Sequence, residues 1–78
     1  MGNEKCVQIF CKNIRYLRVS RGLTQKQMAQ VIGISVGTLR RIERGDRSFR
    51  FHGEHLCALC DAFDISADRL VYSVLKNE

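Results

Sequence analysis

Three arginines, Arg40, Arg41 and Arg44, fall within a stretch of five residues. On a helix, where successive residues are 100° apart, they share one face with Val36 and Gly37, and no acidic residue joins them. A guanidinium group binds phosphate oxygens, and in the major groove of DNA it binds O6 and N7 of guanine. This face therefore has the chemistry of a helix that reads double-stranded DNA.

A short helix is expected just before this face. Thr24 and Gln27 have the spacing of a capping box, which predicts a helix over 25–32. Gly33 should end that helix, because glycine tolerates the left-handed backbone that closes a helix abruptly.

Ser35 should cap the next helix, expected over 35–44. The apolar residues that face inward from the two helices are Met28, Ala29, Ile32, Leu39 and Ile42. Two short helices joined by a tight turn are typical of a helix-turn-helix, in which the second helix lies in the major groove and the first braces against the backbone.

Charge is divided unevenly along the chain. Residues 1–52 hold 11 Lys and Arg against three acids, a net charge of +8, whereas residues 53–78 hold two against five, a net charge of −3. The basic part contains the two helices just described. Such a field attracts and orients a polyanion such as DNA. A basic surface that served only solubility would not predict this uneven division of charge.

Three further helices are expected, over 7–21, 54–63 and 66–75, from apolar residues that recur every three or four positions. The last has more apolar surface than one buried face needs, namely Leu70, Val71, Val74 and Leu75. The connection after Gly45 contains Phe49 and Phe51. Either of these packs under the next helix or is exposed for a partner.

The cysteines and histidines offer a second kind of chemistry. Cys57 and Cys60 form a C-x2-C pair, and His52 and His55 lie just before it, which admits a zinc site or a redox switch. The pair falls inside a helical pattern, however, and free cysteine behaves as a small hydrophobe. We therefore expect packing roles, with no metal and no cofactor.

Enzymatic and membrane functions are not expected. The 78 residues allow one small core, without a deep active site, and neither histidine has a recognisable nucleophile and orienting acid. No stretch approaches the roughly 18 apolar residues of a membrane span, and no signal peptide is recognised. The simplest inference is a cytoplasmic protein.

Residues 13–47 and 55–71 resemble the phage-repressor and Cro family of DNA-binding domains, also called the Xre type. The matching residues are Ile14, Leu17, Arg18, Gly22, Leu23, Thr24, Gln25, Met28, Ala29, Gly33, Ile34, Ser35, Leu39, Ile42, Glu43 and Gly45. The resemblance implies a single all-α domain, residues 1–78, that folds as a compact five-helix bundle of the lambda-repressor-like type with a central helix-turn-helix. It also implies a structural ion pair between Arg18 and Glu43.

The site residues follow from this resemblance together with the chemistry above. Base readout is expected from Val36, Gly37, Arg40 and Arg41. Phosphate contacts are expected from Thr24, Gln25, Lys26, Ser35, Arg44 and Arg47, partly because a helix N-terminus favours anions. Gly37 has no side chain, so either the backbone approaches the bases closely or the protein relies more on DNA shape.

The sequence therefore predicts a transcriptional regulator that binds double-stranded DNA as a homodimer on a two-fold symmetric operator. In the family a C-terminal helix often supplies the dimer contact, here through Leu70, Val71, Val74 and Leu75. Two alternatives stay open. One is an antitoxin-like or other protein-interaction module with accessory DNA binding, and the other is a regulator that senses metal or redox state through its cysteines.

Overall fold

Five helices make up the part of the chain that the computed structural model describes, residues 3–46 and 51–75, with side chains described from residue 7 onward. They are α1 (Asn3–Ser20), α2 (Gln25–Ile32), α3 (Val36–Arg44), α4 (Gly53–Phe63) and α5 (Ala67–Tyr72). These residues contain no strand, so the predicted all-α class is confirmed. No helix among them combines the length and the apolar character needed to cross a membrane.

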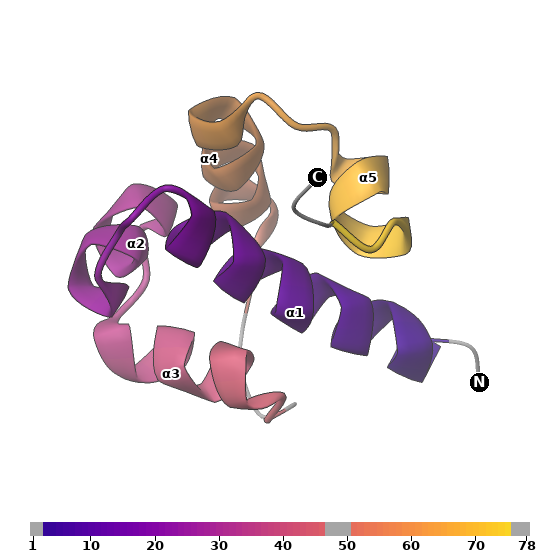
Figure 1. Ribbon diagram of the computed structural model, residues 1–78, viewed down its shortest axis with the longest axis horizontal. Coiled ribbons are helices and arrows are strands. Elements are labelled where there is room, and N and C mark those ends of the chain that lie inside the picture. Colours follow the sequence, from indigo (N-terminus) through magenta and orange to yellow (C-terminus); the bar gives the residue numbers. More distant parts are fainter. Residues whose placement is uncertain (1–2, 47–50, 76–78) are drawn as a thin grey trace.

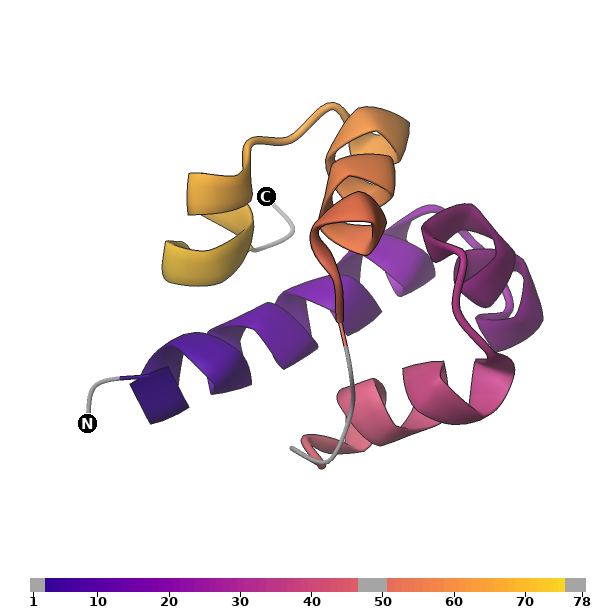
Figure 2. The ribbon, with the colours of Figure 1, turned by 180° about the vertical axis from the view of Figure 1, so that it is seen from behind.

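Helix α1 runs through the middle of the molecule and separates α3 from α5 (Figure 1). The view from behind shows the same arrangement, with α4 and α5 on one side of α1 and α3 on the other (Figure 2). Helix α2 contacts both α3 and α4, and so links the two sides. The core where they meet comprises Phe10, Cys11, Ile14, Leu17, Met28, Ala29, Ile32, Leu39, Ile42, Leu59, Phe63 and Leu70.

Helix α2 begins and ends at the residues whose types predict a helix start and a helix end. Thr24 Oγ1 accepts a hydrogen bond from the Gln27 N–H at 3.0 Å, and Gln27 Oε1 accepts one from the Thr24 N–H at 2.9 Å. Gly33 closes α2 with φ of 90°, in the left-handed region that a side chain would strain. The turn between the two helices is therefore fixed by local chemistry.

Two helix ends differ from expectation by three residues or more. Helix α1 begins at Asn3 instead of residue 7, because a helix can continue beyond its apolar stripe through residues that favour helix, such as Glu4 and Lys5. Helix α5 ends at Tyr72 instead of residue 75, and Ser73 has an extended backbone with φ of −109° and ψ of 132°. The predicted starts at 35, 54 and 66 and the predicted end at 21 each differ from the observed bounds by one residue.

A buried asparagine explains the early end of α5. Asn13 is 1% exposed, and its Nδ2 donates to the carbonyls of Leu70 at 2.6 Å and Ser73 at 2.8 Å. Its Oδ1 accepts from the Leu75 N–H at 3.0 Å. These bonds hold the segment after α5 extended against α1, so that the helix stops where the Asn13 side chain takes over its backbone groups.

The position of Leu70 corrects one expectation about the dimer contact. Leu70 is 0% exposed, in the core of the single chain, and so it has no surface to offer a second copy. Of the other residues expected there, Val74 is 56% exposed, whereas Val71 and Leu75 are half-buried. Tyr72, which is 67% exposed, lies beside them.

Phe51 packs inside the molecule. Its ring meets Phe10 edge to face at 5.0 Å between ring centroids, and it also contacts the His55 ring at 5.5 Å. Phe51 thereby joins the segment before α4 to α1, which is the packing role that the sequence left open. Phe49 lies outside the described residues.

Candidate nucleic-acid interface

The outer face of α3 carries the residues expected to read bases. Gly37, Arg40, Arg41 and Arg44 are exposed there, and Val36 is half-buried. The opposite side of α3 is anchored in the core, so the helix presents this face without further rearrangement. Three of the four residues expected to read bases are thus exposed on one surface, together with Arg44, which was expected to contact phosphate.

An ion pair fixes α3 to α1. Arg18 Nε donates to Glu43 Oε2 at 2.7 Å, and Arg18 Nη2 donates to Glu43 Oε1 at 3.1 Å. The side chains are 16% and 6% exposed. Arg18 Nη1 also donates to the Leu23 carbonyl at 3.0 Å. A two-pronged, largely buried pair of this kind has a fixed geometry and orients the helix that carries it.

Gln25 connects this ion pair to Arg40 on the exposed face of α3. Its Nε2 donates to Glu43 Oε1 at 3.2 Å, and its Oε1 accepts from Arg40 Nε at 3.3 Å. The resemblance implied a phosphate contact for Gln25, but the pattern of residues gave no sign of these two bonds. The second N–H of its amide has no partner among residues 3–46 and 51–75, so Gln25 can hold Arg40 and donate to a phosphate at once.

The two capping hydroxyls differ in what they can offer a phosphate. Thr24 Oγ1 accepts from the Gln27 N–H, which leaves its own proton free to be donated. Ser35 Oγ accepts from the Thr38 N–H at 3.1 Å and donates to Thr38 Oγ1 at 2.9 Å, so its proton is already engaged. Thr24 is therefore the better donor, and Lys26 is exposed on the same first turn of α2.

Arg44 is accessible even though an acid lies nearby. Its Nη2 is 3.7 Å from Asp46 Oδ2, and the side chains are 69% and 37% exposed. Solvent screens a pair this open, and such pairs contribute about 0–1 kcal/mol. Arg44 can therefore exchange this contact for a phosphate. Arg47, which was expected to do the same, lies outside the described residues.

Gly37 has open space around it. A side-chain carbon built on Gly37 would meet only Ser35 Oγ, at 3.9 Å, which is ordinary contact distance. Its backbone is helical, and so the fold of the single chain does not require glycine at this position. The packing of the described residues therefore leaves room for alanine at position 37.

The surroundings of the described cysteines and histidines bear on the alternative of a metal or redox site. Burial raises the pKa of the Cys11 thiol, and burial followed by the charges of Cys57 and Asp61 raises that of Cys60. A raised pKa disfavours the thiolate that would bind metal or react. Within the described ranges, no three His, Cys, Asp or Glu side chains are grouped to hold a metal ion. His55 Nδ1 accepts from the His52 N–H at 3.1 Å at the start of α4.

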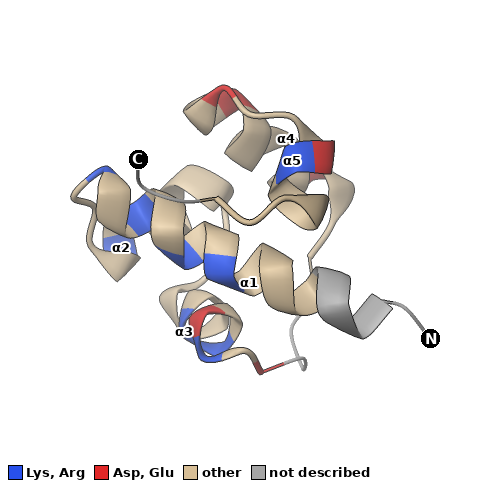
Figure 3. Ribbon diagram, turned by 45° about the vertical axis from the view of Figure 1, so that its right-hand side comes forward, with Lys and Arg blue, Asp and Glu red and all other residues tan. Residues whose placement is uncertain are grey.

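Basic and acidic residues separate in space as they do in sequence. Lys and Arg mark α1, α2 and α3, of which α3 also carries the acid Glu43, whereas α4 carries acids only and α5 carries both signs (Figure 3). The basic side includes the exposed face of α3 and the start of α2. A polyanion would meet this side first.

A family model described as helix-turn-helix matches residues 14–70, which covers all of α2, α3 and α4. Among curated proteins, no sequence matches the chain.

Proposed function

Since this chain belongs to the helix-turn-helix family of the Xre and lambda-repressor type, a family of DNA-binding regulators, we propose that it recognises a specific double-stranded operator as a homodimer. Helix α3 lies in the major groove, and the start of α2 contacts the backbone. The observation that carries this proposal is the exposed α3 face of Gly37, Arg40 and Arg41, with half-buried Val36 beside it, while Glu43 anchors the same helix inside. A cytoplasmic location is part of the proposal.

Within this proposal the polar contacts divide into two kinds. Arg40 and Arg41 carry base readout, since arginine pairs with O6 and N7 of guanine, and Val36 can lie against a thymine methyl. The phosphate contacts come from Thr24, Gln25, Lys26, Ser35, Arg44 and Arg47. Those contacts set register and orientation and carry no sequence information directly.

The second copy would dock through the end of α5 and the segment that follows it. Tyr72 and Val74 are large apolar residues that the single chain leaves more than half exposed. Val71 and Leu75 lie beside them with part of their surface covered. Two-fold dimers are the commonest assembly, and a dimeric helix-turn-helix places its two reading helices about one DNA turn apart.

Selection of bound fragments from random DNA, followed by sequencing, tests the proposal. We expect a two-fold symmetric motif with half-sites one helical turn apart, and a dimeric mass in light scattering at micromolar concentration with DNA. A single unrepeated motif together with a monomeric mass would reject the homodimer. If no motif is enriched, sequence-specific recognition is wrong.

Arg41→Ala should relax base preference at one position in each half-site and cost about 1–3 kcal/mol in discrimination there. The Arg41 side chain makes no hydrogen bond or ion pair to the described residues, so its loss should not affect the fold. Repeating the selection with the variant gives the readout, and Lys26→Ala is the control because it should weaken all sequences alike. Equal weakening of every sequence by Arg41→Ala would assign this arginine to phosphate contact.

Gly37→Ala should raise the free energy of unfolding by up to about 1 kcal/mol, because alanine favours helix and the position has room for a methyl group. If the α3 backbone lies against the bases, the same variant should bind the selected operator less tightly while unfolding at a higher temperature. Thermal melting and fluorescence anisotropy measure the two effects. Unchanged affinity would show that Gly37 is not needed for close approach.

A further inference from the structure

A row of basic side chains lines the groove between α1 and α3, and the expected contacts to DNA leave part of it unused. One hollow of about 370 Å³ is bounded by Arg15, Arg18, Gln25, Arg40, Glu43 and Arg44. A second, of about 390 Å³, lies further along between Lys12 of α1 and Arg44 of α3. Both are lined by Glu43 and Arg44, so they adjoin one another, and together we call them the α1/α3 groove.

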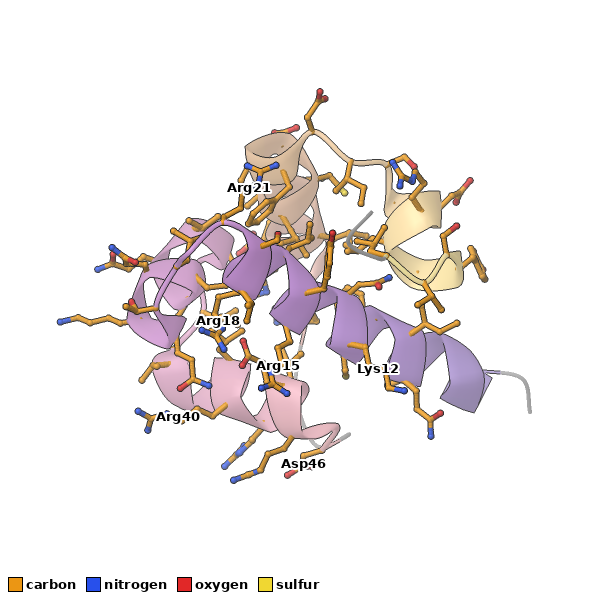
Figure 4. The ribbon with its side chains drawn as sticks, in the orientation of Figure 1. Lys12, Arg15, Arg18, Arg21, Arg40 and Asp46 are labelled. Atoms are coloured by element: carbon orange, nitrogen blue, oxygen red, sulfur yellow. The ribbon has the colours of Figure 1, made fainter. Side chains whose placement is uncertain are left out.

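Positive charge in this groove exceeds negative charge. The acidic residue that lines the groove is Glu43, and Arg18 neutralises it through a contact of 2.7 Å between Arg18 Nε and Glu43 Oε2. Lys12 and Arg15 are exposed, and neither forms an ion pair with any residue in the described ranges. In Figure 4, Arg15 lies between α1 and α3, with Arg40 to its left and Lys12 to its right. Like charges gathered without counterions repel one another, and an anion placed among them removes that repulsion.

The spacing and position of these cations suit a DNA strand. Three residues advance a helix by about 4.5 Å, and one strand carries a phosphate for about every 3.4 Å of duplex axis, so Lys12 and Arg15 can reach neighbouring phosphates. Gln25 and Arg40 lie at one end of the same groove. A strand that meets the free N–H of Gln25 would therefore pass next along α1.

We propose that the α1/α3 groove is a further phosphate-binding surface, in which Lys12 and Arg15 neutralise the DNA strand that continues beyond Gln25. The inference rests on the proposed function and adds α1 to the DNA-contacting elements. Arg15 shares its hollow with Arg40, but both Lys12 and Arg15 belong to α1 and lie outside the base-reading helix, so both should contribute affinity without sequence preference.

The double variant Lys12→Ala/Arg15→Ala tests this directly. Affinity for the selected operator and for random duplex is measured from 50 to 200 mM salt. Log affinity falls as log salt rises, and each lost phosphate contact makes this negative slope shallower by about 0.9. The slope of the double variant should therefore be shallower by about 1.8. Over this fourfold salt range the wild type should lose about 12-fold more affinity than the variant. The preference for operator over random duplex should stay unchanged.

Arg69→Ala is the matched control, because Arg69 is an exposed cation on α5, away from the groove. Its slope should equal that of the wild type, and all variants should melt as the wild type does. A double variant with the wild-type slope would overturn the inference while leaving the proposed function intact. A groove that binds inorganic phosphate in calorimetry but leaves the DNA slope unchanged would also overturn it. A wild type that binds no DNA would reject both.

Discussion

Glu43→Ala should lower the free energy of unfolding by about 3–5 kcal/mol, a large part of the 5–15 kcal/mol typical of a whole domain. Glu43 is 6% exposed and accepts two hydrogen bonds from Arg18 and one from Gln25. Its removal leaves the Arg18 guanidinium, 16% exposed, without a counter-charge. Denaturant unfolding followed by circular dichroism measures the loss.

Two further variants separate the orphaned charge from the lost contacts. Arg18→Ala/Glu43→Ala should be less destabilised than the sum of its single variants, because no unpaired charge remains buried. Asp61→Ala, which removes an exposed acid from α4, should stay within about 0.5 kcal/mol of the wild type. A loss below about 1 kcal/mol for Glu43→Ala would mean that solvent screens the pair as it does at a surface.

Asn13→Ala should lower the free energy of unfolding by about 2–3 kcal/mol, because buried groups that lose a hydrogen-bond partner each cost about 1–3 kcal/mol. The variant removes two donated bonds and one accepted bond, which together tie the end of α5 to α1. Thermal unfolding gives the loss. Hydrogen exchange of the Leu75 amide should accelerate in the variant beyond what the change in global stability explains.

Gln8→Ala provides the control for Asn13, since Gln8 is an exposed polar residue on the same helix. It should unfold within about 0.5 kcal/mol of the wild type. If Asn13→Ala unfolds like this control, the bonds to the segment after α5 contribute nothing net to stability. In that case the extended backbone at Ser73 needs another cause.

Features that depend on neighbours in sequence were predictable. The capping box at Thr24 and the stop at Gly33 use partners within four residues, and so the residue types alone place the start and end of α2. The fold class and the family follow from the resemblance that residues 13–47 and 55–71 carry. The ion pair between Arg18 and Glu43 was available only through the resemblance, since 25 residues separate its partners.

Features that depend on three-dimensional proximity were not predictable. Gln25 bonds to residues 18 and 15 positions away, and only the crossing of α2 and α3 brings them together. Asn13 did leave a signal, because it lies beside Ile14 on the apolar face of α1 where a lone polar residue needs partners. Its partners are 57 to 62 residues distant, so the early end of α5 could not follow from local pattern.

The bond between Gln25 and Arg40 has a consequence for how this protein can evolve. A change at Arg40 removes a partner from Gln25, which also serves Glu43, so a new base preference acquired there disturbs the support of the helix itself. Arg41 has no such partner among the described side chains. Because proteins tolerate substitutions that cost no stability, drift in operator preference should accumulate at Arg41 before Arg40. Under the proposed function, the two adjacent arginines would thus be a variable position, Arg41, and a constrained one, Arg40.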